Sequence, residues 1–105
     1  MASSQRMRPY YAVIFTSRKR SDTPGYEAAS QRMLQMVAKM PGFISADSAR
    51  SQDGFGITVS YWENVEALRH WGRDPVHQAT QKRGREEWYE HFSVRVAQVI
   101  EERNS

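Results

Sequence analysis

The apolar residues of this chain alternate between the two-residue spacing of strands and the three- and four-residue spacing of helices. The strongest strand signal covers Tyr10 to Ser17, where β-branched and aromatic residues make both faces apolar, as in a strand covered on both sides. Further strands are predicted over Phe43 to Gln52, Phe55 to Trp62 and Trp88 to Glu101. Asp53-Gly54 predicts a two-residue hairpin turn between the second and third strands, because both residues tolerate positive φ.

A first helix is predicted between the first two strands. Asp22 or Thr23 is expected to cap it, with Pro24 at the first helical position. Pro41-Gly42 is expected to end it. Its buried stripe follows the helical spacing and comprises Tyr26, Ala29, Met33, Val37 and Met40.

A second helical segment is predicted after the third strand. Asn64 is expected to cap it, and Leu68 and Trp71 are its apolar contacts. Asp74-Pro75 then interrupts and restarts the helix, with Asp as the cap and Pro as the first residue. Gly84 is expected to end the restarted part, whose stripe comprises Val76, Ala79, Thr80 and Arg83.

The order strand, helix, strand, strand, helix, strand predicts an α+β, ferredoxin-like βαββαβ domain with an antiparallel sheet and helices on one face. We expect Phe55, Ile57, Val59 and Tyr61 to face the helices, and Tyr10, Ile14 and Trp62 to lie on the opposite, apolar face. That second face needs a cover, and the sheet of a second copy would supply it in a two-fold homodimer. The expected organisation is an N-terminal arm over residues 1–9, the domain over 10–101 and a tail over 102–105.

Composition narrows the function. The chain has no cysteine, which excludes a thiolate nucleophile, a disulfide and a cysteine-ligated metal. The net charge of +3 is spread among acidic residues, so neither nucleic acid nor a membrane is predicted as a partner. No apolar run approaches the roughly 20 residues of a spanning helix, and no signal peptide is visible, so a cytoplasmic location is expected. No His, Asp or Glu group has metal-ligand spacing, and neither metal nor cofactor is predicted.

Several short motifs occur in an order that resembles a known family. They are Pro41-Gly42-Phe43, Tyr61-Trp62-Glu63-Asn64 leading to Trp71, then His77, and Gly84-Arg85 to Trp88-Tyr89. Together they resemble the antibiotic biosynthesis monooxygenase (ABM) family over Tyr10 to Glu101. The resemblance implies two protomers forming a dimeric α/β barrel. It also implies a cofactor-independent monooxygenase that oxidises a hydrophobic aromatic phenol or quinol, with the substrate supplying the electrons.

Two alternatives stay open. One is a non-catalytic, small-molecule-binding or structural dimer of the same fold. The other is haem binding or degradation, as in a branch of the family with a strand Asn, a Trp and a His ten residues after that Trp. Trp71 matches the Trp, but Gln81 stands where that branch has its His, and Tyr10 to Ser17 contains no Asn. The same Asn is missing for the quinone-forming branch.

His77 is the predicted catalytic residue. It follows Pro75 by two, at the rim of the helix-covered face, and a histidine with a pKa near neutrality suits deprotonation of a phenol. With the resemblance, the predicted substrate-binding residues are Trp71, Gln81, Arg85, Tyr89 and His91.

Each of these residues also has a structural interpretation. His77 is then a partly exposed polar residue, and Trp71 is part of the core. Arg85 forms an ion pair with a neighbouring glutamate. His91 shares one strand face with Tyr89 and Arg95, at the dimer-facing side of the sheet.

Overall fold

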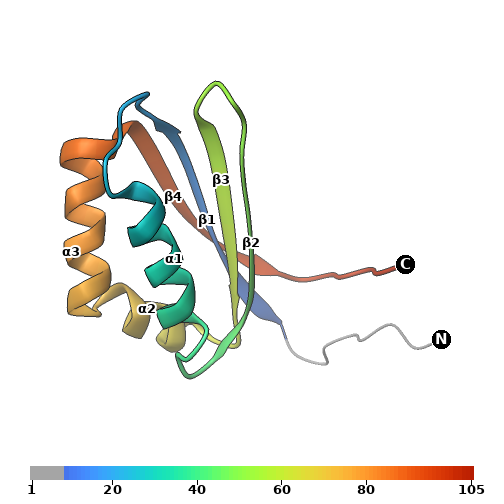
Figure 1. Cartoon of the computed structure of the whole chain (residues 1–105). Helices are drawn as coiled ribbons and strands as arrows, with labels where there is room; N and C mark the ends of the chain where they lie inside the picture. Colours follow the sequence, from blue (N-terminus) through green and yellow to red (C-terminus); the bar gives the residue numbers. More distant parts are fainter. Residues whose placement is uncertain (1–8) are drawn as a thin grey trace.

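The computed structural model describes residues 9–105 as a single sheet with helices on one of its faces (Figure 1). The chain order is β1 (Tyr10–Lys19), α1 (Tyr26–Val37), β2 (Phe43–Arg50), β3 (Phe55–Trp62), α2 (Val65–Gly72), α3 (Pro75–Arg83), the π-helical turn η1 (Gly84–Trp88) and β4 (Tyr89–Val99). The predicted ferredoxin-like architecture is confirmed. Nearly all of the predicted N-terminal arm lies outside the described residues.

The four described strands are antiparallel and lie in the order β2-β3-β1-β4. Helices α1, α2 and α3 cover one face, and no described element covers the other (Figure 1). The core lies under the helices, where Val37, Trp62 and Trp71 are buried against one another. Burial of large aromatic side chains is the main stabilising contribution available to so small a domain.

The prediction of which β3 face meets the helices is wrong. Trp62 is paired with Tyr11 and is fully buried on the helix side, not on the opposite face. The outer face instead carries Phe55, Ile57, Val59 and Tyr61. Strict alternation of apolar and polar residues favoured the wrong face, because the helix side of β3 borders a cavity and its small and polar residues need no close packing.

A bulge in β4 overturns a second assignment. Arg18 pairs with His91 and Lys19 pairs with Tyr89, so Glu90 is an extra residue in β4. Tyr89 therefore lies on the helix side, while His91 lies on the outer face. The prediction that these two side chains share a face is wrong, because simple alternation does not continue through a bulge.

The ends of α1 also differ from the prediction. Neither Asp22 nor Thr23 caps the helix, because α1 begins at Tyr26 after Gly25, whose φ is 83°. Pro24 lies in the preceding turn, where its carbonyl accepts hydrogen bonds from Trp88 and Arg83. The helix ends at Val37, before Pro41-Gly42.

The hairpin between β2 and β3 is longer than the predicted two-residue turn. Gly54 N–H donates to the Ser51 carbonyl at 3.1 Å, and Ser51 N–H donates to the Phe55 carbonyl at 2.8 Å. Gly54 has a φ of 100°, whereas Asp53 does not adopt positive φ. The Asp53 carboxylate instead accepts from Ser51 and from the Phe55 N–H, which stabilises the longer loop.

Both predicted caps of the second helical segment are confirmed. The Asn64 side chain accepts from Ala67 N–H at 2.8 Å, and Asp74 Oδ1 accepts from Val76 and His77 N–H at 2.9 and 3.0 Å. The helix does not end at Gly84 but continues as η1, so β4 begins at Tyr89 and ends at Val99. None of the helices within residues 9–105 is long and apolar enough to cross a membrane.

Candidate functional site

A cavity of about 500 Å³ lies between the helices and the sheet. Its walls are mainly apolar and aromatic, as is usual for small-molecule sites. Its charged lining residues are Arg50, Arg69 and Arg73, and none of the described lining residues is Asp or Glu. The apolar and aromatic part of the lining includes Val13, Phe15, Met33, Leu68, Trp71, Trp88, Tyr89 and Phe92.

One wall is formed where α2 passes into α3. Asp74 and Pro75 stop one helix and start the next, and this break turns the first residues of α3 back over Trp71. The rings of Trp71 and His77 stack at a centroid distance of 4.2 Å and an interplanar angle of 11°. Both side chains line the cavity.

The hydrogen bonding of His77 defines its tautomer. Nδ1 lies 2.9 Å from the Trp71 carbonyl oxygen, which can only accept, so Nδ1 carries the proton. The other ring nitrogen, Nε2, receives no hydrogen bond from the described residues. Burial lowers the pKa of His77 below its ordinary value of 6.5, and the Trp71 carbonyl and the Asp74 charge only partly oppose this. At neutral pH the ring is therefore neutral and has a free basic nitrogen.

A second wall is a cluster of aromatic rings around Tyr89. Its ring lies 5.4 Å from Phe15 and 6.1 Å from Tyr26. Gly84 makes room for it, since a Cβ there would lie 2.7 Å from Tyr89 Cε2. Burial raises the pKa of Tyr89 above its ordinary value of 10.0; Tyr26 adds to this rise, and the charge of Arg50 opposes it. Tyr89 is therefore a protonated phenol at neutral pH and can donate a hydrogen bond.

The other predicted residues are placed as follows. Gln81 lines the cavity but is largely exposed, at its rim. Arg85 lines a shallow groove on the outer side of α3 and not the cavity. His91 is exposed on the outer face of the sheet. Four of the six predicted residues, Trp71, His77, Gln81 and Tyr89, are thus brought to one cavity.

Sequence reasoning missed Tyr26 and Arg50 as site residues. Tyr26 was assigned only to the buried stripe of α1, and Arg50 to a half-polar strand. The Arg50 guanidinium lies 5.6 Å from the centre of the Tyr26 ring and 5.8 Å from that of Tyr89. The one signal was Gly56, the β3 partner of Arg50, where any Cβ would overlap the guanidinium. Within residues 9–105, no three His, Asp or Glu side chains gather as metal ligands would.

Comparison with protein families gives one match that covers most of the chain. The antibiotic biosynthesis monooxygenase family matches residues 9–83. The uncharacterized protein YqjZ of Bacillus subtilis is 47% identical over 95 residues, which cover 90% of this chain and 83% of that protein. Jasmonate monooxygenase ABM of Pyricularia oryzae is 28% identical over 92 residues, but these cover 85% of this chain and only 43% of that protein.

Solved structures share the fold at low sequence identity. Rv0793 from Mycobacterium tuberculosis superposes with a TM-score of 0.79 at 20% identity, covering 90% of this chain and 99% of that one. A variant of SnoaB, a cofactor-independent oxygenase from Streptomyces nogalater, superposes with a TM-score of 0.76 at 14% identity, covering 89% and 95% of the two chains.

Proposed function

Because this chain belongs to the antibiotic biosynthesis monooxygenase family, we propose that it is a cofactor-independent monooxygenase acting on a hydrophobic aromatic phenol or quinol. The observation that carries this proposal is the neutral His77 ring, whose Nε2 is free in the wall of a largely apolar cavity. A base of this kind removes a proton from a phenol most effectively when its own pKa is near the working pH.

The proposed reaction begins with transfer of a proton from the substrate to His77 Nε2. Molecular oxygen adds to the carbon of the resulting anion, and the peroxide anion takes the proton back from His77. The hydroperoxide formed in this way then loses water to leave a carbonyl. One CH₂ group and one O₂ give one C=O group and one H₂O, so the substrate supplies all the electrons. The apolar cavity would limit access of water to the anion.

Trp71 and Tyr89 are proposed to bind the substrate. Trp71 is held by the core on one side and stacked on His77 on the other, so the base cannot rotate freely away from it. Tyr89 presents a protonated hydroxyl that can donate to a substrate oxygen or to the oxygen of the developing anion. Gln81, at the rim, is proposed to contact the part of the substrate that remains near the opening.

The names of two similar proteins are consistent with an oxygenase. One is a jasmonate monooxygenase and the other a cofactor-independent oxygenase. The alternative for this chain is a dimer of the same fold that binds a small molecule without oxidising it. The difference between the two lies in whether His77 accepts a proton from the bound molecule.

The test is oxygen consumption with a panel of anthrones and naphthols, for the wild type and His77→Gln. We expect loss of the base to slow turnover by about 10²- to 10⁴-fold. His70→Gln is the matched control, because His70 is exposed on α2 and stands outside the cavity lining. Equal rates for wild type and His77→Gln would remove His77 from the reaction. Binding of panel members without any oxygen uptake would favour the non-catalytic alternative.

We also propose that two copies form a homodimer through the outer faces of their sheets. That face has no cover within the described chain, and it carries Phe55 and Ile57 with exposed fractions of 43% and 38%. Apolar surface of this kind is typically covered by a partner. In a two-fold arrangement, one self-complementary interface would cover the outer face of both copies.

A further inference from the structure

The charges around the cavity are of one sign. Arg50, Arg69 and Arg73 line it, and no Asp or Glu is among the described lining residues. The arginines at Arg69 and Arg73 are largely exposed and solvated, whereas Arg50 is half-buried. A charge removed from water is costly unless an opposite charge compensates it, so the position of Arg50 is the informative one.

Within residues 9–105, every hydrogen-bond acceptor of Arg50 is neutral. Nη2 donates to Ser17 Oγ at 2.7 Å and to the Tyr26 hydroxyl at 3.3 Å. Nη1 donates to the carbonyls of Ser17 and Gly54. The Nε–H donates to no described residue, and no carboxylate of the described chain forms an ion pair with this guanidinium.

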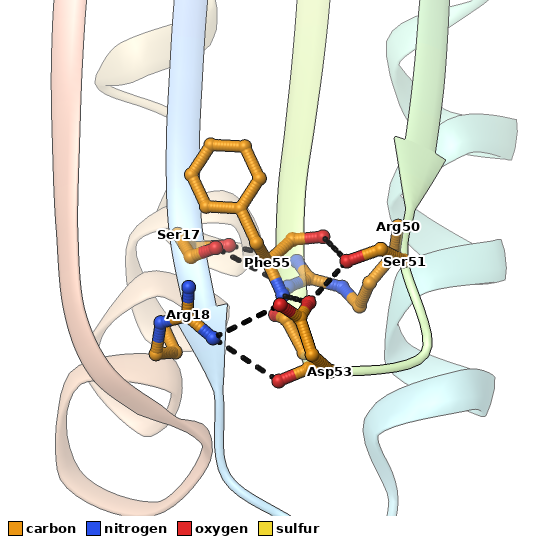
Figure 2. A network of polar contacts seen from close by, with 7 residues as sticks. Ser17, Arg18, Arg50, Ser51, Asp53 and Phe55 are labelled. Atoms are coloured by element: carbon orange, nitrogen blue, oxygen red, sulfur yellow. Dashed lines mark hydrogen bonds and ion pairs between the residues drawn. The ribbon is translucent and has the colours of Figure 1, made fainter.

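The nearby acid is engaged elsewhere. Figure 2 shows Asp53 in the β2–β3 hairpin, with its carboxylate turned to Ser51, Arg18 and the Phe55 N–H. These contacts lower the pKa of Asp53, with the Ser51 hydroxyl and the Phe55 N–H as the largest causes. The charge of the exposed Asp53 is thus compensated by these partners. The charge of Arg50 has no counterion in the described chain.

The guanidinium is also held in place before any ligand binds. It lies over the faces of Tyr26 and Tyr89, and Gly56 leaves the space it occupies. A cation fixed in this way loses little conformational entropy on binding an anion. The hydroxyl of Tyr89, protonated at neutral pH and hydrogen-bonded to Tyr26, places a neutral polar group beside it.

Arg50 and His77 mark opposite ends of the cavity. Arg50 ends β2 at the hairpin and pairs with Gly56, whereas Trp71, stacked on His77, packs on Trp62 at the far end of β3. The β2–β3 hairpin and the α2–α3 junction lie at opposite ends of the molecule in Figure 1. The strand from Gly56 to Trp62 spans about 20 Å at roughly 3.3 Å per residue.

We propose that the ligand of this cavity is an elongated hydrophobic carboxylic acid, with its carboxylate on Arg50 and its apolar ring system reaching toward Trp71 and His77. This inference rests on the proposed function, because it names the class of phenol or quinol that the oxygenase takes. Arg50 is then a specificity-determining residue that selects acids over neutral aromatics.

The test compares binding of anthraquinone-2-carboxylate with binding of the neutral anthraquinone-2-carboxamide by calorimetry. A charge-assisted contact of the expected kind gives the acid an advantage of about tenfold to hundredfold over the amide. In Arg50→Gln the two affinities are expected to become equal, while the amide binds as it does to the wild type. Arg32→Gln is the control, since Arg32 is exposed on α1 and outside the cavity lining.

Two outcomes would overturn the proposal: no preference for the acid in the wild type, or an unchanged preference in Arg50→Gln. The comparison of acid and amide binding by the wild type remains a test even if Arg50→Gln fails to fold. Arg50→Lys keeps the positive charge and is expected to retain part of the preference for the acid. Because the readout is binding, it is independent of turnover. Failure of the oxygenase proposal would show as absent oxygen uptake, with the acid preference intact.

Discussion

The two ring nitrogens of His77 have different environments, and this difference sets the expected pH dependence of turnover. The reaction needs Nε2 without a proton, and burial lowers the pKa of His77 below its ordinary value of 6.5. Activity is therefore expected to persist at pH 6.5 and to decline only at lower pH. The measurement is kcat/KM against pH, which reports groups of the free enzyme. An acid limb centred above 6.5 would contradict the assignment of His77 as base.

The same group links stability to pH. The pKa of His77 is lower in the folded state than in the unfolded chain, so the unfolded chain binds more protons as pH falls. The contribution of the neutral His77 side chain to the free energy of unfolding is fully present above its pKa in the unfolded chain. That contribution is lost as the pH falls toward the lower pKa of His77 in the folded state. Comparison of Tm at pH 7.5 and pH 5.5 should show a larger drop for wild type than for His77→Gln. Equal drops in Tm for the wild type and His77→Gln would mean that His77 does not contribute to the pH dependence of stability.

The backbone of Gly84 packs closely against the Tyr89 ring. Gly84→Ala would place a methyl group 2.7 Å from the Tyr89 ring, in the space between η1 and β4. Overpacking of this kind typically costs about 1–3 kcal/mol, measurable by urea unfolding. Gly72→Ala is the matched control, because a Cβ at Gly72 meets no atom within 4 Å. A neutral Gly84→Ala would mean that the Tyr89 ring moves freely.

The α2–α3 junction shows how one short motif serves both folding and chemistry. The Asp74 carboxylate accepts from the N–H groups of Val76 and His77, and so fixes the backbone that presents the imidazole. Asp74→Ala is expected to cost about 1 kcal/mol of stability, as loss of a helix cap usually does. Asn64→Ala removes a comparable cap from α2 and is expected to cost about the same.

These two cap variants are expected to differ in activity. Asp74→Ala should reduce kcat well beyond any reduction in Asn64→Ala, because only Asp74 holds the His77 backbone. Thermal unfolding and oxygen uptake measured on the same preparations separate the two effects. Equal losses of activity in both variants would assign Asp74 a purely structural role.

The elements were predictable wherever the signal is local. Caps, turn residues and apolar spacing act over a few residues, and they located the four described strands and α1, α2 and α3, but not η1. The end of α1 and the length of the hairpin were wrong by a few residues, since competing turn geometries differ little in free energy. The orientation of β3 was wrong for a different reason. Apolar alternation identifies two faces but does not say which one borders a cavity.

The site was predictable in part. Trp71 and His77 lie within one local motif, and the family resemblance pointed to Gln81 and Tyr89 as well. Arg50 was missed because its partners come from distant parts of the chain, including β1 and α1. No local pattern distinguishes an arginine that reaches a cavity from one that reaches solvent.

At the scale of the whole molecule, the uncovered face of the sheet gives a prediction about assembly. Ile57→Glu would place a charge in the proposed sheet–sheet interface, and a buried unpaired carboxylate there would destabilise the dimer. Light scattering is expected to give twice the 12.2 kDa chain mass for wild type and the single mass for Ile57→Glu. Ala79→Glu, on the exposed side of α3, should leave the mass unchanged. A monomeric wild type would contradict the proposal.

The extra residue in β4 decides which side chain of this strand enters the cavity. With Glu90 in the bulge, Tyr89 pairs with Lys19 and lies under the helices. If β4 ran regularly through this point, Glu90 would pair with Lys19 and Tyr89 would lie on the outer face. Loss of the bulge alone would therefore exchange the phenol beside Arg50 for a carboxylate, although no residue of the sequence had changed at a position that lines the cavity. Ligand preference can in this way change through strand pairing, which a position-by-position comparison of lining residues would not detect.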